Sequence, residues 1–199
     1  MGRGTRSRAV PGFGASRVDG ERSLPNRLLA QLEERTEQLA LINGVLRTIV
    51  AGAALPHILK VFASNLKTIC PFDRCSISLY DARRKIFKVP YMVMGGKVVE
   101  TRERPRPFAS SPLSRVVTTR RPMLRRNVRA ERKTYEIDRA FLAKGYACEM
   151  LLPLQVGDEV LGTFNLGTWE ADRFSGDHLR LLQDVVPAIA VAVWSHRRR

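Results

Sequence analysis

Residues 151–167 have the sequence LLPLQVGDEVLGTFNLG, in which a Gly-Asp pair at residues 157–158 separates two apolar runs. Glycine adopts a positive φ without steric cost and aspartate tolerates one, so this pair predicts a tight turn between two strands. In the second run Val160, Phe164 and Leu166 share one parity, which predicts a strand with one strongly apolar face. The stretch therefore predicts a β-hairpin that buries one side.

An amphipathic helix is predicted to follow the hairpin. Ser175 can cap its N-terminus, and Asp177 in the first turn suits the helix dipole. Its apolar residues recur at spacings of three and four, and they are Leu179, Leu182, Val186, Ile189 and Val193. Pro187 removes one backbone hydrogen bond inside this helix and should kink it. A hairpin followed by such a helix predicts a helix that packs on a sheet.

These residues resemble the C-terminal half of a GAF domain, and an upstream half matches as well. The upstream residues are CPFDRCSISLYD at 70–81 and SRVVTTRRPML at 114–124, so that the resemblance covers residues 39–194. It implies an α+β, PAS-like fold, in which helices flank a central antiparallel sheet of about six strands. It also implies a sensor or regulatory module similar to those of bacterial histidine kinases and related signalling proteins.

A long helix is predicted at residues 24–50, ahead of the main body of this domain. Its apolar residues alternate at spacings of four and three, which is typical of a coiled coil. The seam consists of Leu28, Leu32, Leu39, Ile42, Leu46 and Ile49. Because so narrow a seam cannot bury itself alone, we expect it to pair with the same helix of a second subunit and form a homodimer. The alternative is that it packs on its own domain.

The predicted domain organisation has four parts. Residues 1–23 form a disordered basic tail, residues 24–50 the dimerising helix, residues 51–196 the GAF domain and residues 197–199 a second basic tail. Inside the domain, residues 130–144 are predicted to form a helix that Gly145 ends. Pro90 lies in a predicted strand and places it at a sheet edge or a bulge.

The positive charge of the chain is concentrated in one segment. The 199 residues carry 34 Lys and Arg against 19 Asp and Glu, a net charge of +15, and residues 101–133 hold ten Arg and one Lys against two Glu. The resemblance places a ligand pocket beside this segment, and arginine offers a planar fork of donors to a carboxylate or phosphate. We therefore predict a small anionic ligand, with contacts from Arg115, Arg120, Arg121, Arg125, Tyr146 and Cys148. The alternative is that these arginines form a solvated outer face.

Several other partners and locations are not expected. No helix-turn-helix signature or aromatic stacking platform accompanies the basic segment, so nucleic acid is not an expected partner. The longest apolar run, residues 185–194, is far shorter than the ~20 residues of a membrane span. Three cysteines and no secretory signal indicate a reduced, cytoplasmic protein.

Catalysis is not expected either. One GAF-fold family reduces free methionine sulfoxide with cysteines in its pocket loops, but the corresponding loop here has the sequence SSPLS at residues 110–114. Cys70, Cys75 and Cys148 have no nearby histidine at a metal-ligand spacing, so neither a metal nor a cofactor is identified.

The sequence thus favours a signal-sensing domain. It would bind a small molecule or receive a signal from a partner, and relay it through its terminal helices in bacterial signal transduction, including two-component systems. No kinase, cyclase or ATPase motif is present, so the output would lie in another domain or a partner protein. One alternative is a ligand-free dimerisation and assembly module, and a less favoured one is a methionine sulfoxide reductase.

Overall fold

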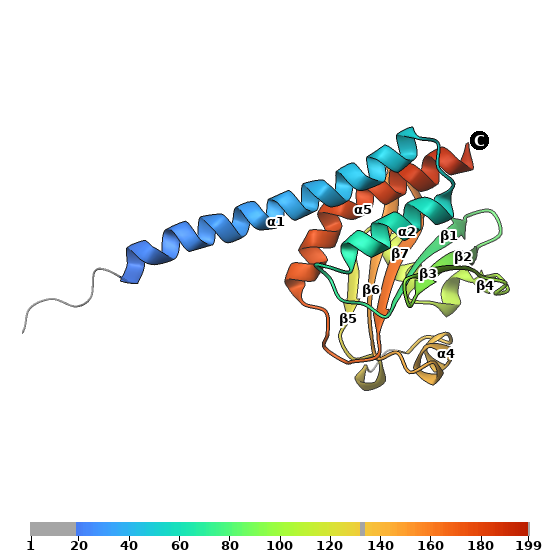
Figure 1. The fold of residues 1–199 in the computed structure, drawn as a ribbon. Helices are drawn as coiled ribbons and strands as arrows, with labels where there is room; N and C mark the ends of the chain where they lie inside the picture. The colour runs from blue at the N-terminus through green and yellow to red at the C-terminus, as the bar shows by residue number, and fades with distance from the viewer. Residues whose placement is uncertain (1–18, 132–133, 199) are drawn as a thin grey trace, which may run out of the picture. The chain divides into compact units, whose positions relative to one another are not determined.

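The predicted hairpin is present as β6 (Cys148–Val156) and β7 (Glu159–Thr168), joined at Gly157, whose φ is 57°. The computed structural model describes residues 19–131 and 134–198 (Figure 1). The other strands are β1 (Arg74–Asp81), β2 (Ile86–Met94), β3 (Lys97–Glu100), β4 (Arg106–Pro107) and β5 (Met123–Arg125). The helices are α1 (Asp19–Val50), α2 (Leu55–Leu66), α3 (Leu113–Thr119), α4 (Asp138–Ala143) and α5 (Gly176–Arg197), with 3-10 turns η1 (Phe108–Ser110) and η2 (Val128–Ala130).

All strand pairs are antiparallel. The strands follow the order β3-β2-β1-β7-β6-β5, and β4 pairs with the outer side of β2. The continuous path of six strands confirms the predicted sheet, and the two-residue β4 adds a seventh. The expected α+β architecture, with a long N-terminal helix ahead of the sheet, is also confirmed.

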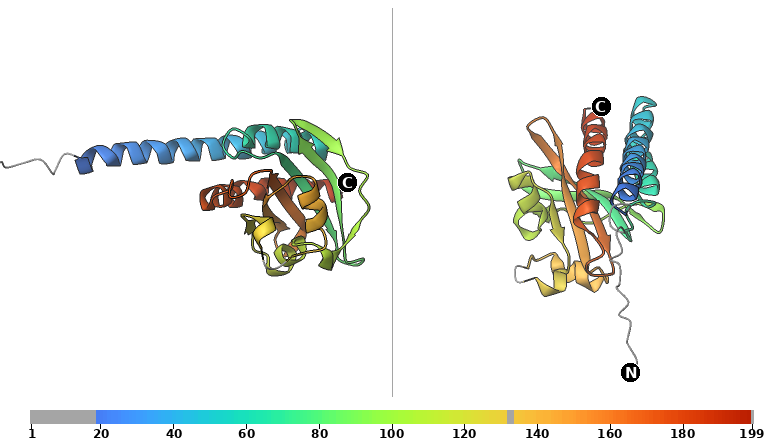
Figure 2. Two further views of the ribbon diagram at one scale, coloured as in Figure 1. Left: turned by 90° about the horizontal axis from the view of Figure 1, so that it is seen from below. Right: turned by 90° about the vertical axis from the view of Figure 1, so that its left-hand side faces the viewer.

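Helices cover both faces of the sheet. On one face, called the helix face, Ile77 of β1 and Phe164 of β7 pack into a core with α2 and α5, which lie side by side (Figure 2). On the other, called the cavity face, Leu151 of β6 packs with α3. Ser78 and Asn165 lie one residue along β1 and β7 from these core residues, so they point to the cavity face.

Two irregularities shape the middle of the sheet. The pairing of β1 with β2 shifts between Ile77 and Leu79, opposite Pro90, which confirms the bulge predicted at that proline. A second shift lies where Leu154 pairs with Gly162, and it leaves Leu161 as an extra residue buried in the core. The first bulge lies opposite Ser78, which points to the cavity face.

The chain divides after Thr36 into two units, so residues 19–36 of helix α1 belong to the first unit and residues 37–50 to the second. The helix begins at Asp19, so residues 19–23 of the expected tail are helical. Residues 1–18 lie outside the described residues. In the second unit Leu41 and Val45 of this helix are buried in the core of the domain.

The predicted seam of α1 is only partly covered. Ile42 and Ile49 pack against the core of the second unit, whereas Leu39 and Leu46 are exposed. In the first unit the seam residues Leu28 and Leu32 are exposed. The seam thus uses some of its apolar residues for its own domain and leaves the others available.

Of two further predicted helices, one is shorter than expected and the other begins at the expected residue. The helix expected at residues 130–144 is confined to α4, because Glu131 and Asp138 both bind Arg125 and the Asp138 carboxylate accepts the backbone N–H of Tyr135. These contacts replace the backbone hydrogen bonds of a longer helix. Helix α5 begins at the predicted cap, Ser175, and continues through Pro187.

The C-terminal basic segment is not entirely a tail. Arg197 is the last residue of α5 and donates from Nη2 to the carbonyl oxygens of Tyr80 and Leu161, each at 3.0 Å. Leu161 is the extra residue of the second bulge, so Arg197 binds a carbonyl at an irregular point of β7.

Within the described residues, the helices are too short or too polar to cross a membrane.

Candidate functional site

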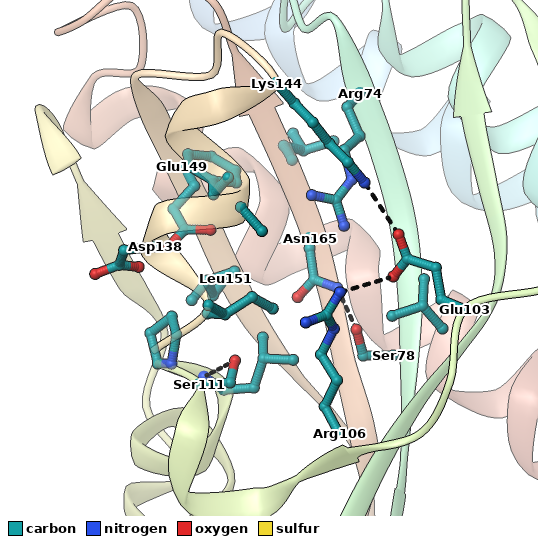
Figure 3. A pocket seen from close by; sticks show the side chains of 17 residues that line it. Arg74, Ser78, Glu103, Arg106, Ser111, Asp138, Lys144, Glu149, Leu151 and Asn165 are labelled. Carbon is teal, nitrogen blue, oxygen red and sulfur yellow. Dashed lines mark hydrogen bonds and ion pairs between the residues drawn. The ribbon is translucent and has the colours of Figure 1, made fainter. Parts of the chain in front are cut away.

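A cavity of about 60 Å³ lies on the cavity face, between the sheet, α3, α4 and the loop that leads to β4 (Figure 3). One water molecule needs about 10–15 Å³ by this measure, so the cavity has room for a small organic molecule. Its polar lining residues are Arg74, Ser78, Glu103, Arg106, Ser111, Asp138, Lys144, Glu149 and Asn165. Its apolar lining includes Leu113, Phe141 and Leu151.

Asn165 of β7 forms the floor of the cavity, and it is only 6% exposed. Its Nδ2 donates to Ser78 Oγ at 2.8 Å and to the Ser76 carbonyl oxygen at 3.4 Å. Because a carbonyl oxygen can only accept, the amide nitrogen belongs on that side, and Oδ1 points into the cavity (Figure 3). Oδ1 has no hydrogen-bond partner within residues 19–131 and 134–198. A buried acceptor left unpaired costs about 1–3 kcal/mol, so a donor that reaches Oδ1 would stabilise the protein.

The basic wall of the cavity consists of Arg74, Arg106 and Lys144, together with Glu103. Lys144 Nζ lies 3.0 Å from Glu103 Oε1, and Arg106 Nη2 lies 3.8 Å from Glu103 Oε2. Partial burial acts to raise the pKa of Glu103, but the hydrogen bond from Lys144 and the charges of the cations hold it below its usual value. Arg74 donates from Nη2 to Ser76 Oγ at 3.2 Å, while its buried Nε has no partner among the residues described.

The acidic wall consists of Asp138 and Glu149, with Arg125 and Glu131 behind them. Arg125 is 1% exposed, and its Nη1 lies 2.8 Å from Asp138 Oδ1 and 2.6 Å from Glu149 Oε1. Its Nε donates to Glu131 Oε2 at 2.8 Å. Burial alone would lower the pKa of Arg125, but the hydrogen bond with Asp138 and the charge of Glu149 raise it, so the guanidinium stays charged. Burial raises the pKa of Glu149, and Arg125 opposes that shift.

The predicted ligand contacts lie elsewhere. The cavity lining does not include Arg115, Arg120, Arg121, Arg125, Tyr146 or Cys148. Arg125 is behind the acidic wall, bound by carboxylates. Arg120 and Arg121 are exposed, and Arg120 donates to the carbonyl oxygen of Asp158 at 3.1 Å. Arg115 lines an open surface groove with Tyr135.

The other two predicted contacts are buried. Tyr146 packs on Phe141, with 5.1 Å between ring centroids, and the guanidinium carbon of Arg74 lies 5.8 Å from the centroid of its ring. Cys148 belongs to the core on the helix face. Contact of these six residues with an anionic ligand stays a prediction.

Sequence reasoning missed the residues that line the cavity. A usable signal was present in the strands, since Ser76, Ser78 and Asn165 are polar residues at alternate positions of two strands whose other face is apolar. Glu103, Arg106 and Lys144 had no such signal, because only the folded chain brings the loop before β4 to the end of α4.

The three cysteines are free and buried. Burial raises the pKa of each thiol, to about 12 for Cys70. None of them is among the residues that line the cavity. In the described part of the chain, no group of three or more His, Cys, Asp or Glu residues is arranged to hold a metal ion.

A family model for the GAF domain matches residues 53–193. The chain belongs to the GAF domain family. A comparison of this GAF domain with curated proteins finds no significant match.

Solved structures of GAF domains are similar in fold. The GAF domain of a phosphoenolpyruvate-protein phosphotransferase from Coxiella burnetii has a TM-score of 0.65 and 15% identity, covering 82% of this chain and 96% of its own. The GAF domain of a two-component sensor histidine kinase from Bacillus halodurans has a TM-score of 0.59 and 16% identity, covering 68% and 90%. A type II free methionine-R-sulfoxide reductase from Thermoplasma acidophilum has a TM-score of 0.56 and 13% identity, covering 71% and 92%. At these identities the likeness concerns the fold alone.

Proposed function

We propose that this GAF domain is a sensor that binds a small molecule in the cavity and relays the event through its terminal helices in bacterial signal transduction. The observation that carries the proposal is Asn165 Oδ1, a buried acceptor that points into the cavity without a partner among the described residues. Charged groups from the loop before β4, from α4 and its C-terminal end, and from three strands converge on the same space. An assembly module would gain more stability from an apolar core at this place.

The strands provide the route for the signal. Asn165 on the floor of the cavity alternates along β7 with Phe164 and Leu166, which pack in the core that includes α2, α5 and the end of α1. A ligand that holds Asn165 therefore acts on the same strand that supports the terminal helices. The mechanism is a population shift, in which the ligand binds one arrangement of strands and helices more tightly than the other.

The proposed setting is a cytoplasmic homodimer. The exposed seam residues of α1 form its interface, and the output belongs to another domain or a partner protein, as in a two-component system. The fold that this chain shares with the GAF domain of a sensor histidine kinase supports this setting. Catalysis is not part of the proposal.

Native mass spectrometry of the purified full chain tests the proposal. We expect a bound small molecule that is released on unfolding, and loss of that molecule in Asn165→Leu, whose fold is checked by circular dichroism. Adding the released molecule at 100 times its Kd should stabilise the wild type by about 2.7 kcal/mol. A wild-type protein that carries no small molecule, and that no fraction of a cell metabolite extract stabilises, would favour the alternative of a ligand-free assembly module.

A methionine sulfoxide reductase is a weaker alternative. The nucleophile of such chemistry is a thiolate, and burial raises the pKa of all three thiols here. We expect the native cysteines to react with a thiol reagent only after unfolding. Turnover of free methionine sulfoxide that Cys148→Ser abolishes would support the reductase instead.

A further inference from the structure

We infer that the ligand of this cavity is a small zwitterion of the amino-acid type, with a carboxylate held at the basic wall and an ammonium held at the acidic wall. This inference rests on the proposed function, since it names the chemical class that the sensor would bind. It comes from the opposite charges of the two walls and from the unpaired acceptor between them.

The basic wall has the charge and the hydrogen-bond donors to bind a carboxylate. Among the described residues that form it, three cations, Arg74, Arg106 and Lys144, stand against the single carboxylate of Glu103. Glu103 bridges Lys144 and Arg106 in the way that a carboxylate ligand would. Arg74 has a buried Nε without a partner among the described residues, so this wall keeps a free donor for a second carboxylate.

The acidic wall has the charge to bind a cation. The acidic wall and the residues behind it together hold three described carboxylates, of Glu131, Asp138 and Glu149, against the one guanidinium of Arg125 that they bind. Arg125 is surrounded by these carboxylates and is not among the lining residues, whereas Asp138 and Glu149 line the cavity. A ligand thus meets two carboxylates on this side, and an ammonium group would balance the excess negative charge.

The floor and the size of the cavity restrict the class of ligand further. Asn165 Oδ1 lies between the walls in Figure 3, with its oxygen directed into the cavity, where it can accept a hydrogen bond from an ammonium N–H. The apolar side chains of Leu113 and Leu151 line the same space and suit a short aliphatic part. A volume of about 60 Å³ limits the ligand to a few carbon atoms between its charged groups.

A charge series of small probes tests this class without any substitution. Calorimetry of the full chain is carried out with alanine, β-alanine and 4-aminobutyrate, which carry both charges at increasing separation, and with propionate and propylamine, which carry one each. We expect at least one zwitterion to bind about tenfold or more tightly than both single-charge probes, a difference of about 1.4 kcal/mol. Equal binding of propionate would overturn the inference in favour of a simple anion, and equal binding of propylamine would overturn it in favour of a simple cation.

Variants of both walls test the inference: Lys144 and Arg106 have solvent-accessible side chains outside the Arg125 network, and Glu149 belongs to that network. Lys144→Gln and Arg106→Gln should each weaken zwitterion binding about tenfold, while Lys97→Gln, a substitution of an exposed lysine on β3, should leave it unchanged. Glu149→Gln keeps a side chain of the same size and should abolish the preference for a zwitterion over propionate. Unchanged affinity in Lys144→Gln and Arg106→Gln would show that the probe binds elsewhere and would overturn the inference.

The experiments distinguish failure of the zwitterion inference from failure of the proposed sensing role. If none of the probes binds but the purified protein carries another small molecule that Asn165→Leu loses, the zwitterion inference is wrong and the sensing role stands. If the protein carries no small molecule and no probe binds, both are wrong.

Discussion

Arg125 and Asp138 are joined by two parallel hydrogen bonds, from Nη1 to Oδ1 at 2.8 Å and from Nη2 to Oδ2 at 2.9 Å. The same guanidinium also binds Glu149 of β6 and Glu131. Arg125 therefore ties β5, β6 and α4 together from inside the protein. It fixes the carboxylates of the acidic wall in place, which explains why a residue from the basic segment is almost completely buried.

Substitution of Arg125 should destabilise the domain strongly. Arg125→Met leaves the buried carboxylates of Asp138 and Glu149 without their counter-charge, and breaking one side of such a network costs about 3–5 kcal/mol. The matched control is Arg126→Met, because its neighbour Arg126 is exposed; we expect a change within about 0.5 kcal/mol. Urea unfolding at pH 7 measures both. Similar stability of the two variants would show that the carboxylates are solvated and not held by Arg125.

The elements that depend on local patterns could be predicted from the sequence. The Gly-Asp turn, the alternating strand β7 and the Ser175 cap each follow from a few neighbouring residues, and all three are present. Pro90 similarly predicted a sheet edge or a bulge, because a proline cannot donate to a strand neighbour, and a bulge is present.

The cavity could not be predicted in the same way. Its walls depend on which charged side chains are buried together, and charge and spacing in the sequence do not distinguish Arg125, which is buried, from Arg121, which is exposed. The buried arginine finds carboxylates that are 6, 13 and 24 residues away along the chain. Only the fold brings them together, which is why the basic segment alone did not indicate the residues that line this cavity.

Gly162 should not tolerate a side chain. Its φ is 153°, and an added Cβ would lie 1.9 Å from the carbonyl oxygen of Ser78 on the neighbouring strand. We expect Gly162→Ala to lower the free energy of unfolding by about 3 kcal/mol, because β1 and β7 would have to separate. Gly157→Ala is the control: its φ of 57° is strained for alanine but its surroundings are open, so a loss of about 1 kcal/mol is expected. Equal losses measured by thermal unfolding would contradict the close approach at Gly162.

His178 should make the start of α5 sensitive to pH. Its Nδ1 accepts the backbone N–H of Ser175 at 3.1 Å, while Ser175 Oγ accepts the backbone N–H of His178 at 3.2 Å. Burial lowers the pKa of His178 below its usual value, and protonation of Nδ1 removes the acceptor. The unfolded chain thus binds the proton more readily than the folded one. The contribution of this contact is complete above a pH of about 6.5 and is lost as the pH falls through the lower pKa of the folded state.

His178→Gln separates this effect from other titrations. Glutamine at the same position can accept the same hydrogen bond without titrating. Denaturant unfolding between pH 5 and pH 8 should therefore show a smaller rise in stability with pH for His178→Gln than for the wild type, while His178→Ala should lose up to about 1 kcal/mol at pH 8. The other two histidines are unchanged in these variants and serve as an internal reference. Identical pH profiles for the wild type and His178→Gln would show that titration of His178 does not affect the stability of the cap.

The exposed leucines of α1 should control dimer formation. Leu39 is 59% exposed and Leu46 is 41% exposed. The two leucines are seven residues apart and lie on the predicted seam. Burial of a leucine against a partner helix contributes about 1.5–3 kcal/mol, so Leu39→Lys combined with Leu46→Lys should weaken a dimer by about 100-fold or more without unfolding the domain. Leu29→Lys is the matched control, because Leu29 is 57% exposed and lies off the seam. Sedimentation equilibrium should show a dimer for the wild type and the control, and a monomer for the double variant. A monomeric wild type, or a control that dissociates as readily as the double variant, would mean that this seam does not mediate self-association.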